Sequence, residues 1–230
     1  MSGKYQRRND SPTVKLSKSL SYVLRHGAQK EGLNIRADGY MRLPRFRGKT
    51  LDEIQQVVKE NDKQRFTLIQ QATENGDIVW WIRANQGHSL DVEELELEKI
   101  TDSAQIPQVI HGTYSSKWKS IETQGLSKMN RTHIHLATGK WGDKNVKSGM
   151  RASCDVHIYI NVHEAMKDGI EFYRSSNGVI LTKGVKGILD KKYFLKVVDK
   201  NEKFLYGQRD SNVIKNIDEQ DHEKGIFILS

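Results

Sequence analysis

The apolar pattern of this chain changes at an acidic stretch, residues 91–98, and the change restricts the fold to two dissimilar parts. Before this stretch, apolar residues recur at helical intervals in two segments, whereas after it they fall mainly in short strand-like runs. A chain of 230 residues is long enough for two modest domains, each with a core of its own. The sequence therefore predicts an α+β protein in which a helix-containing first lobe precedes a strand-rich second lobe.

The first helix is predicted to start at Ser11-Pro12, because a serine cap followed by proline is a typical helix start. Apolar residues then recur every three or four positions, and Gly27 is expected to end the helix. Arg25 and His26 therefore fall in the last turn. The helix dipole repels an anion there, so any bound phosphate must be held by side chains.

A second helix and a hairpin are predicted to complete the first lobe. Thr50–Glu53 has the spacing of a capping box, and an amphipathic pattern follows it to about Asn61. Two strand-like runs, residues 65–71 and 78–84, flank Asn75-Gly76, which is a typical hairpin turn. Two helices followed by a hairpin are similar to a winged helix, a common nucleic-acid platform, although this step is an analogy between folds.

The second lobe is predicted to be strand-rich α+β. Strands are expected at residues 109–114, 133–137, 156–162, 178–182 and 193–198, and short helices at residues 116–124 and 163–167. The predicted organisation is a mobile basic arm at residues 1–10, a winged-helix-like lobe at 11–100, a linker at 101–107 and the second lobe at 108–230.

Positive charge is concentrated at the start of the chain. Residues 1–50 contain 12 lysines and arginines against three acidic residues, whereas residues 51–230 contain 25 against 26. A basic segment on an otherwise balanced chain is the electrostatic footprint of a polyanionic partner, most simply nucleic acid. The alternative is a solubilising tail, but the basic residues continue as far as Lys49, within a segment that is predicted to fold.

The sequence favours an intracellular protein. No run approaches the roughly 18 apolar residues of a membrane span, and the N-terminus lacks the apolar segment of a signal peptide. The single cysteine, Cys154, excludes an intramolecular disulfide framework and agrees with a reducing compartment. The choice between nucleus and cytoplasm stays open, no membrane partner is expected, and we expect a monomer.

The sequence lacks the motifs of several common enzyme classes. The chain has no Gly-x-Gly-x-x-Gly, no Walker A loop and no Gly-x-Ser-x-Gly elbow. His133 and His135 share one face of a predicted strand, and Cys154 and His157 could complete a zinc set, but the spacing matches no established zinc motif. No metal is therefore expected. One His-Gly-Thr tripeptide, at residues 111–113, is similar to half of the paired motif of cyclic phosphodiesterases, but no second copy occurs.

Four residues in three separate places favour an enzyme that acts on a phosphate. Arg25, Arg65 and Arg151 offer guanidinium forks with permanent charge, and His26 can gain or lose a proton near neutrality. A single arginine is usually a solvated surface residue, and sequence distance does not show that these four residues converge.

At these residues the chain resembles the RNA 2′-phosphotransferase (KptA-like) family, including its fungal members that act on tRNA. The similar segments occur in the family's order over nearly the whole chain: Leu16–Lys18, Leu24–Gly27, Asp38–Tyr40, Lys63–Phe66, Ile82–Ser89, His111–Thr113, His133–Ala137, Gly149–Arg151 and Asn177–Val179. Each segment is short, but their ordered combination is specific. The family's Arg-His-Arg-Arg tetrad would fall on the four residues named above, Arg25, His26, Arg65 and Arg151, with no departure.

The resemblance implies a site for RNA and a site for NAD. It implies an N-terminal RNA lobe and a C-terminal lobe with the ADP-ribosyltransferase type of NAD-binding fold. The residues that would bind NAD are His111, Gly112, Thr113, His133, Asn177 and Gly178. Arg83, Asn85, Gln86, His88 and Ser89 are rich in donors for RNA oxygens, but they could equally organise the junction between the lobes.

The resemblance also implies a reaction. The family removes the internal 2′-phosphate that splicing leaves in tRNA, consumes NAD, and releases nicotinamide, ADP-ribose 1″,2″-cyclic phosphate and RNA with a free 2′-hydroxyl. Two alternatives stay open. One is an ADP-ribosyltransferase that modifies a terminal phosphate of a nucleic acid or a protein, and the other is a non-catalytic RNA-binding protein built on the basic lobe.

Overall fold

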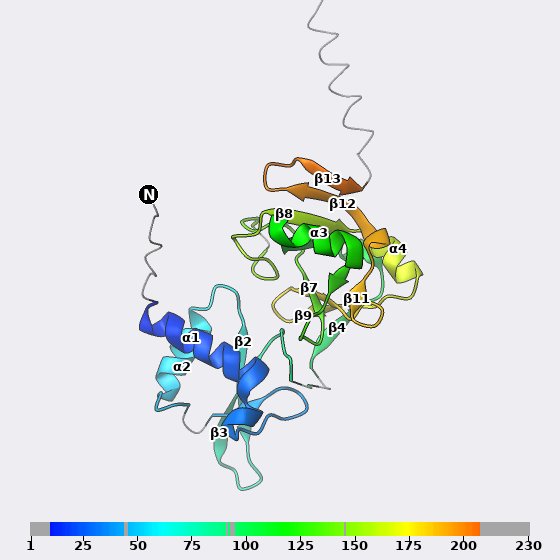
Figure 1. The fold of residues 1–230 in the computed structure, drawn as a ribbon. Coiled ribbons are helices and arrows are strands. Elements are labelled where there is room, and N and C mark those ends of the chain that lie inside the picture. Colours follow the sequence, from blue (N-terminus) through cyan, green and yellow to red (C-terminus); the bar gives the residue numbers. More distant parts are fainter. Residues whose placement is uncertain (1–9, 44–45, 91, 93–94, 145, 208–230) are drawn as a thin grey trace, which may run out of the picture.

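The computed structural model describes residues 10–43, 46–90, 92, 95–144 and 146–207. They form two lobes that lie side by side (Figure 1). We call residues 10–90 the first lobe and residues 95–207 the second lobe. Apart from Asp10, the predicted basic arm lies outside the described residues, as do residues 208–230 of the predicted second lobe. Within the described ranges, no helix is long and apolar enough to cross a membrane.

Helix α1 (Pro12–Tyr22) starts where the sequence predicts, and the Ser11 hydroxyl accepts the N–H of Val14 as its cap. The helical backbone then continues past the predicted end at Gly27. A π-helical turn covers Val23–Gly27 and a 3₁₀ turn covers Gln29–Glu31, and the backbone reverses only at Gly32, with φ of 65°. Gly27 has a packing role instead, because a Cβ there would lie 2.6 Å from the Tyr22 ring.

The rest of the first lobe follows the predicted pattern. Helix α2 (Leu51–Lys59) begins with the predicted capping box between Thr50 and Glu53. Strands β2 (Phe66–Ala72) and β3 (Ile78–Ala84) form the predicted hairpin, and β1 (Met41–Arg42) pairs with the other edge of β3, all antiparallel. The two helices pack on this sheet through a core that includes Leu20, Leu24, Ile54 and Ile82.

The second lobe contains two four-stranded antiparallel sheets and one short ladder. The first sheet has the order β4 (Leu97–Ile100), β9 (Phe172–Ser175), β10 (Ile180–Thr182) and β7 (Ile134–Leu136). The second has the order β13 (Phe204–Gly207), β12 (Phe194–Asp199), β8 (Val156–Ile160) and β5 (Ile110–Thr113). Strands β6 (Leu126–Ser127) and β11 (Ile188–Leu189) form the ladder.

The second lobe also contains short helices. They are α3 (Ser115–Gln124), α4 (Val162–Lys167) and two 3₁₀ turns, Ser103–Gln105 and Lys191–Tyr193. Trp118 of α3 packs against the core of the lobe, and its ring lies beside Phe194 of β12 and Tyr206 of β13. The α+β class is therefore correct, and both helices lie within a residue of their predicted positions.

Strand β4 is one of the elements that the sequence pattern missed. Its two central residues, Glu98 and Lys99, are charged, and it belongs to a stretch that we assigned to the acidic segment and the first lobe. In the structure β4 pairs with β9 of the second lobe, and the charges pair across the strands, Glu98 with Arg174 and Lys99 with Glu171. Cross-strand ion pairs therefore replace the apolar alternation that identifies most strands.

Hydrogen bonds to backbone carbonyls join the two lobes at one junction. The N–H of Thr132 donates to the carbonyl of His88 (3.0 Å), and the Asn177 amide donates to the carbonyl of Lys63 (3.0 Å). The Lys63 ammonium in turn donates to the carbonyl of Met150 (3.2 Å). Segments that are far apart in the sequence therefore meet where the predicted site residues lie.

Candidate active site

Arg25 lies in the π-helical turn and is fixed by its backbone. Its carbonyl accepts the N–H groups of Ser89 (3.0 Å) and Leu90 (3.2 Å), so the turn and the segment after β3 are joined. A Cβ at Gly87, whose φ is +89°, would lie 3.5 Å from the guanidinium. The Nε and Nη2 atoms of Arg25 are buried without a hydrogen-bond partner among the described residues. Buried donors of this kind are normally satisfied, so this arrangement suits an anionic ligand.

His26 is oriented by the same segment. Its Nδ1 lies 2.8 Å from the Ser89 hydroxyl, which also lies 3.4 Å from the Arg25 carbonyl. If that hydroxyl donates to the carbonyl, it accepts from Nδ1–H, and the lone pair of Nε2 is left to accept a proton. Burial lowers the pKa of His26, and the charges of Arg25 and Arg131 lower it further, so the neutral ring is favoured near pH 7.

Arg65 follows α2, and Asn61 holds it in place. The Asn61 side-chain oxygen accepts both the backbone N–H (3.0 Å) and the guanidinium (3.3 Å) of Arg65. Burial lowers the pKa of Arg65. Burial also lowers the pKa of Lys63, and the charges of Arg65 and Arg151 lower it further. Arg25, Lys63 and Arg65 line one cavity of about 530 Å³.

Arg151 is presented by a turn that is wedged between two strands. A Cβ at Gly149, whose φ is +97°, would lie 2.9 Å from the Leu136 carbonyl of β7. A Cβ at Gly112 of β5 would lie 2.6 Å from the Met150 side chain, so only glycine leaves room for this packing. The turn therefore holds the exposed Arg151 at the junction, within the electrostatic influence of Lys63.

Arg131 belongs to the same cluster, although the sequence analysis did not single it out. Burial and the charges of Arg65 and Arg131 lower the pKa of Arg25 to about 10. The charge of Arg131 also contributes to the lowered pKa of His26. Arg151 acts on Arg131 in turn. The only signal in the sequence was that Arg131 lies two residues before His133.

The junction thus gathers five cations from both lobes. They are Arg25, Lys63 and Arg65 from the first lobe and Arg131 and Arg151 from the second. None of the five forms an ion pair within the part of the chain that the structure describes. Mutual repulsion and burial both disfavour such a cluster, so a bound polyanion would relieve it.

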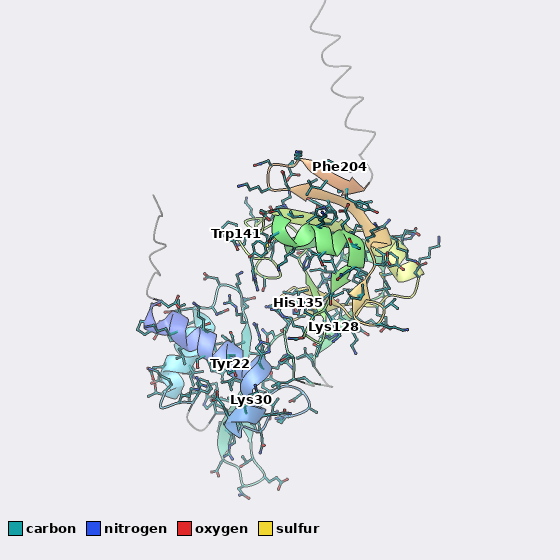
Figure 2. All side chains as sticks on the ribbon, viewed as in Figure 1. Tyr22, Lys30, Lys128, His135, Trp141 and Phe204 are labelled. Carbon is teal, nitrogen blue, oxygen red and sulfur yellow. The ribbon has the colours of Figure 1, made fainter. Side chains whose placement is uncertain are left out.

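Four histidines surround this cluster. His111 Nδ1 donates to the His135 carbonyl (2.9 Å), which joins β5 to β7, and His133 Nδ1 lies 2.9 Å from the Thr132 hydroxyl. Both ring nitrogens of His88 and the Nε2 of His135 are buried without a partner among the described residues. In Figure 2, His135 lies in the part of the second lobe that is nearest to the end of α1 marked by Tyr22.

The surroundings of these histidines keep them neutral. Burial, followed by the charges of neighbouring cations, lowers the pKa of His88 and of His133 to about 4 and that of His135 to about 3. Burial also lowers the pKa of His111, although its bond to the His135 carbonyl raises it. The described residues contain no group of three or more His, Cys, Asp or Glu placed to hold a metal ion.

The remaining residues predicted to bind NAD lie on the second lobe's side of the junction. Gly112 and Thr113 belong to β5, and Thr113 is buried. Both polar atoms of the Asn177 side chain are used within the protein, by Lys63 and Ser175. Gly178, with φ of +79°, forms the turn between β9 and β10. The structure thus gives Asn177 a role at the lobe junction, and the role of these residues toward NAD stays a prediction.

Four of the five residues predicted to bind RNA are buried. The Arg83 guanidinium pairs with Glu96 (2.6 Å) and lies over the Tyr40 ring, and the Asn85 amide donates to the Gln64 carbonyl (2.7 Å). Gln86 and His88 are buried as well, and Ser89 is exposed. This placement favours the alternative that we left open, in which these residues organise the lobe junction.

Comparison with known proteins agrees with this geometry. The sequence profile of the "RNA 2'-phosphotransferase, Tpt1 / KptA family" matches residues 11–184. The chain belongs to this family. The predicted membership and the predicted class of enzyme, a transferase, are therefore confirmed.

The family includes named relatives that are similar over most of this chain. The Schizosaccharomyces pombe protein named "Putative tRNA 2'-phosphotransferase" is 46% identical over 95% of this chain and 60% of its own length. The tRNA 2′-phosphotransferase 1 of Danio rerio is 50% identical over 84% of this chain and 88% of its own length. The tRNA 2′-phosphotransferase of Saccharomyces cerevisiae is 40% identical over 85% of this chain and 90% of its own length. The chain thus spans three fifths of the first relative and most of the other two.

The low pKa values of the buried histidines predict a loss of stability in mild acid. An unfolded histidine has a pKa of about 6.5, so between that pH and about 4 the unfolded state binds more protons than the folded state. As the pH is lowered through this range, the free energy of unfolding should fall by roughly 1.4 kcal/mol per pH unit for each such histidine. Urea unfolding of His88→Leu should show a shallower decline than the wild type over this range.

The exposed His163 in α4 provides the control, because His163→Gln removes a histidine without removing a buried one. This variant should keep the wild-type pH dependence. An identical decline in His88→Leu and in the wild type would contradict the assignment of that decline to His88.

Proposed function

We propose that this protein removes the internal 2′-phosphate that splicing leaves in tRNA and transfers it to NAD. The products are nicotinamide, ADP-ribose 1″,2″-cyclic phosphate and RNA with a 2′-hydroxyl. The observation that carries the proposal is the cluster of five unpaired cations around His26, where the two lobes meet. Membership of the 2′-phosphotransferase family and relatives named for tRNA support the same substrate.

The two lobes divide the substrates between them in this proposal. The first lobe, with two helices and a hairpin, is a winged-helix-like platform for RNA, and the excess of positive charge in residues 1–50 favours that role. The second lobe has the ADP-ribosyltransferase type of fold and holds NAD. The predicted boundary then needs one change, because the pairing of β4 with β9 favours a second lobe that begins before Leu97.

The residues at the junction fit NAD chemically. A dinucleotide brings a pyrophosphate and two riboses, and the unpartnered donors of Arg25, His88 and His135 match such oxygens. His111, Gly112, Thr113 and His133 lie on the same side, in β5 and beside β7. When NAD is bound, it supplies an anomeric carbon whose leaving group is nicotinamide.

The arginines act mainly by positioning in the first step. A 2′-phosphate oxygen forms a bond to the anomeric carbon as the bond from that carbon to nicotinamide breaks, and no proton needs to move. Arg25, Arg65 and Arg151 hold the phosphate in line for this attack through bidentate contacts. Their location on both lobes lets the phosphate reach the NAD side of the junction while its RNA stays on the first lobe.

His26 moves the proton in the second step. The neighbouring ribose hydroxyl attacks the phosphorus, the bond from phosphorus to the RNA 2′-oxygen breaks, and one proton passes from the attacking hydroxyl to the leaving oxygen. A neutral His26 with Nε2 free can accept that proton and return it. The guanidinium groups offset the charge that builds on the phosphoryl oxygens.

A product assay tests the proposal directly. The purified protein is mixed with a short RNA that carries one internal 2′-phosphate, with and without NAD, and all phosphate-containing products are followed. We expect the RNA phosphate to be lost only with NAD and to appear in the cyclic phosphate of ADP-ribose. ADP-ribosylated RNA or protein would favour the ADP-ribosyltransferase alternative, and RNA binding without nicotinamide release would favour the binding protein.

Arg65→Lys separates the shape of the clamp from its charge. Lysine keeps the charge but loses the planar fork, so turnover should fall about 10- to 100-fold, as expected for the loss of roughly 1.5–3 kcal/mol of charged hydrogen bonding. The variant should stay folded by circular dichroism. Arg42→Lys in β1, which lies outside the cluster, should keep full turnover, and wild-type turnover in Arg65→Lys would remove Arg65 from the clamp.

Arg131→Gln tests whether this arginine belongs to the site. Its positive charge lowers the pKa of His26, so its removal should raise that pKa, which an NMR titration of the imidazole measures. Turnover should fall about tenfold because one cation facing the phosphate is lost. Lys183→Gln is the control, because it also removes one positive charge. The charge of Lys183 lowers the pKa of His133, so this variant should leave the His26 titration unchanged. An unchanged His26 pKa in Arg131→Gln would contradict the assignment.

A further inference from the structure

A groove runs along α1 to the cation cluster and extends well beyond the space that a single phosphate needs. It is the cavity of about 530 Å³ that Arg25, Lys63 and Arg65 line, and it reaches back along α1 to Thr13. At 1.5 Å per helical residue, the distance from Thr13 to Arg25 is about 18 Å. Pockets of roughly 300–1,000 Å³ hold drug-sized molecules, so this groove has room for about one or two nucleotides.

The wall that α1 contributes carries donors suited to a nucleic-acid backbone. Thr13, Ser17 and Ser21 are spaced by four residues and therefore form one row on the helix, and Arg25 continues it. The Ser17 hydroxyl accepts the Asn61 amide (3.2 Å), which leaves its own proton available to a ligand. Hydroxyl and ammonium donors of this kind commonly contact phosphate and sugar oxygens.

The groove is asymmetric in charge. Lys18 lies on the α1 wall, and two thirds of its side chain is exposed even with its surface ion pair to Asp10. The opposite wall ends in Lys63 and Arg65 at the cation cluster, but before them it carries Glu60 and Asp62, which repel phosphates. A strand in this groove would therefore turn its phosphates towards α1 and its sugars or bases towards the opposite wall.

We propose that this groove binds the single-stranded RNA next to the 2′-phosphate, on one side of it. This inference rests on the proposed function and adds to it an RNA path along α1. The row of hydroxyls and Lys18 contact the backbone, so the enzyme gains affinity from the length of the RNA rather than from its bases. The strand approaches the arginines from the first lobe, which leaves the side of β5 and β7 to NAD.

RNA length measures this contribution. One substrate is a dinucleotide with an internal 2′-phosphate, and two others add three nucleotides of mixed sequence on the 5′ or the 3′ side. In the wild type, one extension should lower KM at least fivefold and the other should not. Equal KM values for all three substrates would overturn the proposal.

Lys18→Ala tests the wall itself against a matched variant. It should reduce the KM advantage of the longer RNA several-fold, and the slope of log KM against log salt should fall by about 0.7, the value for one phosphate contact on a single strand. Lys15→Ala removes the same charge from α1 at an exposed position that does not line the groove. It should keep the wild-type ratio and slope. Equal behaviour of the two variants would overturn the proposal.

A second variant excludes a folding explanation. Thr13→Glu places a negative charge in the groove, but an acidic residue in the first turn stabilises a helix through its dipole. This variant should melt no lower than the wild type and still lose the advantage of the longer RNA. If it keeps that advantage, the groove does not hold the strand.

Binding without turnover separates this inference from the proposed function. Fluorescence anisotropy with the same long RNA, carrying a 2′-hydroxyl instead of the 2′-phosphate, needs neither NAD nor catalysis. Weaker binding by Lys18→Ala than by Lys15→Ala would support the groove even if the wild type transferred no phosphate. Equal binding by the two variants would count against the groove, whatever the enzyme catalyses.

Discussion

Repulsion among five cations is the constraint that the rest of this structure must accommodate. Arg25, Lys63, Arg65, Arg131 and Arg151 come from both lobes. Burial lowers the pKa of the first four, Arg151 is exposed, and none of the five forms an ion pair within the described ranges. Opposite charges could not hold such a cluster without occupying the donors that a phosphate needs. Neutral contacts hold it instead. Backbone N–H groups fix the Arg25 carbonyl, Asn61 holds Arg65, and strand packing places the turn before Arg151. Repulsion among the cations remains in the free protein and is relieved when an anion binds. Binding of the anion therefore stabilises the folded protein.

The same logic explains the contacts between the lobes. The hydrogen bonds of Thr132 to His88, Asn177 to Lys63 and Lys63 to Met150 all use carbonyl acceptors. The ion pair that joins the lobes, Arg83 with Glu96, involves none of the five cations. A junction built on carboxylates would lower the local positive potential and compete with the substrate for the arginines. The Asn177 amide and the His88 carbonyl belong to this neutral framework, so a residue at the junction can support the site through contacts within the protein.

Sequence patterns predicted those parts of the molecule whose signals are local. The cap at Ser11, the capping box at Thr50 and the hairpin turn at Gly76 each depend on a few neighbouring residues, and each is present. Strand β4 was missed because its stabilising partners are charges on another strand, far away in the sequence. Arg131 was missed for a related reason, since its membership of the cluster depends on three-dimensional proximity. The role of the donor-rich residues from Arg83 to Ser89 stayed open for a different reason. Composition reveals donors but does not show whether the fold already uses them, as it does at Arg83 and Asn85.

The cluster also connects binding to proton transfer. Burial lowers the pKa of His26, and the field that attracts a phosphate lowers it further, so the free protein holds a neutral histidine that can accept a proton. A dianion bound among the arginines cancels part of that field and brings a negative charge close to the ring, and both effects raise the pKa of His26. The histidine therefore becomes a stronger base only after the phosphate is in place. Because the Ser89 hydroxyl contacts both the ring and the Arg25 carbonyl, the orientation of the base and the position of the clamp depend on the same short segment.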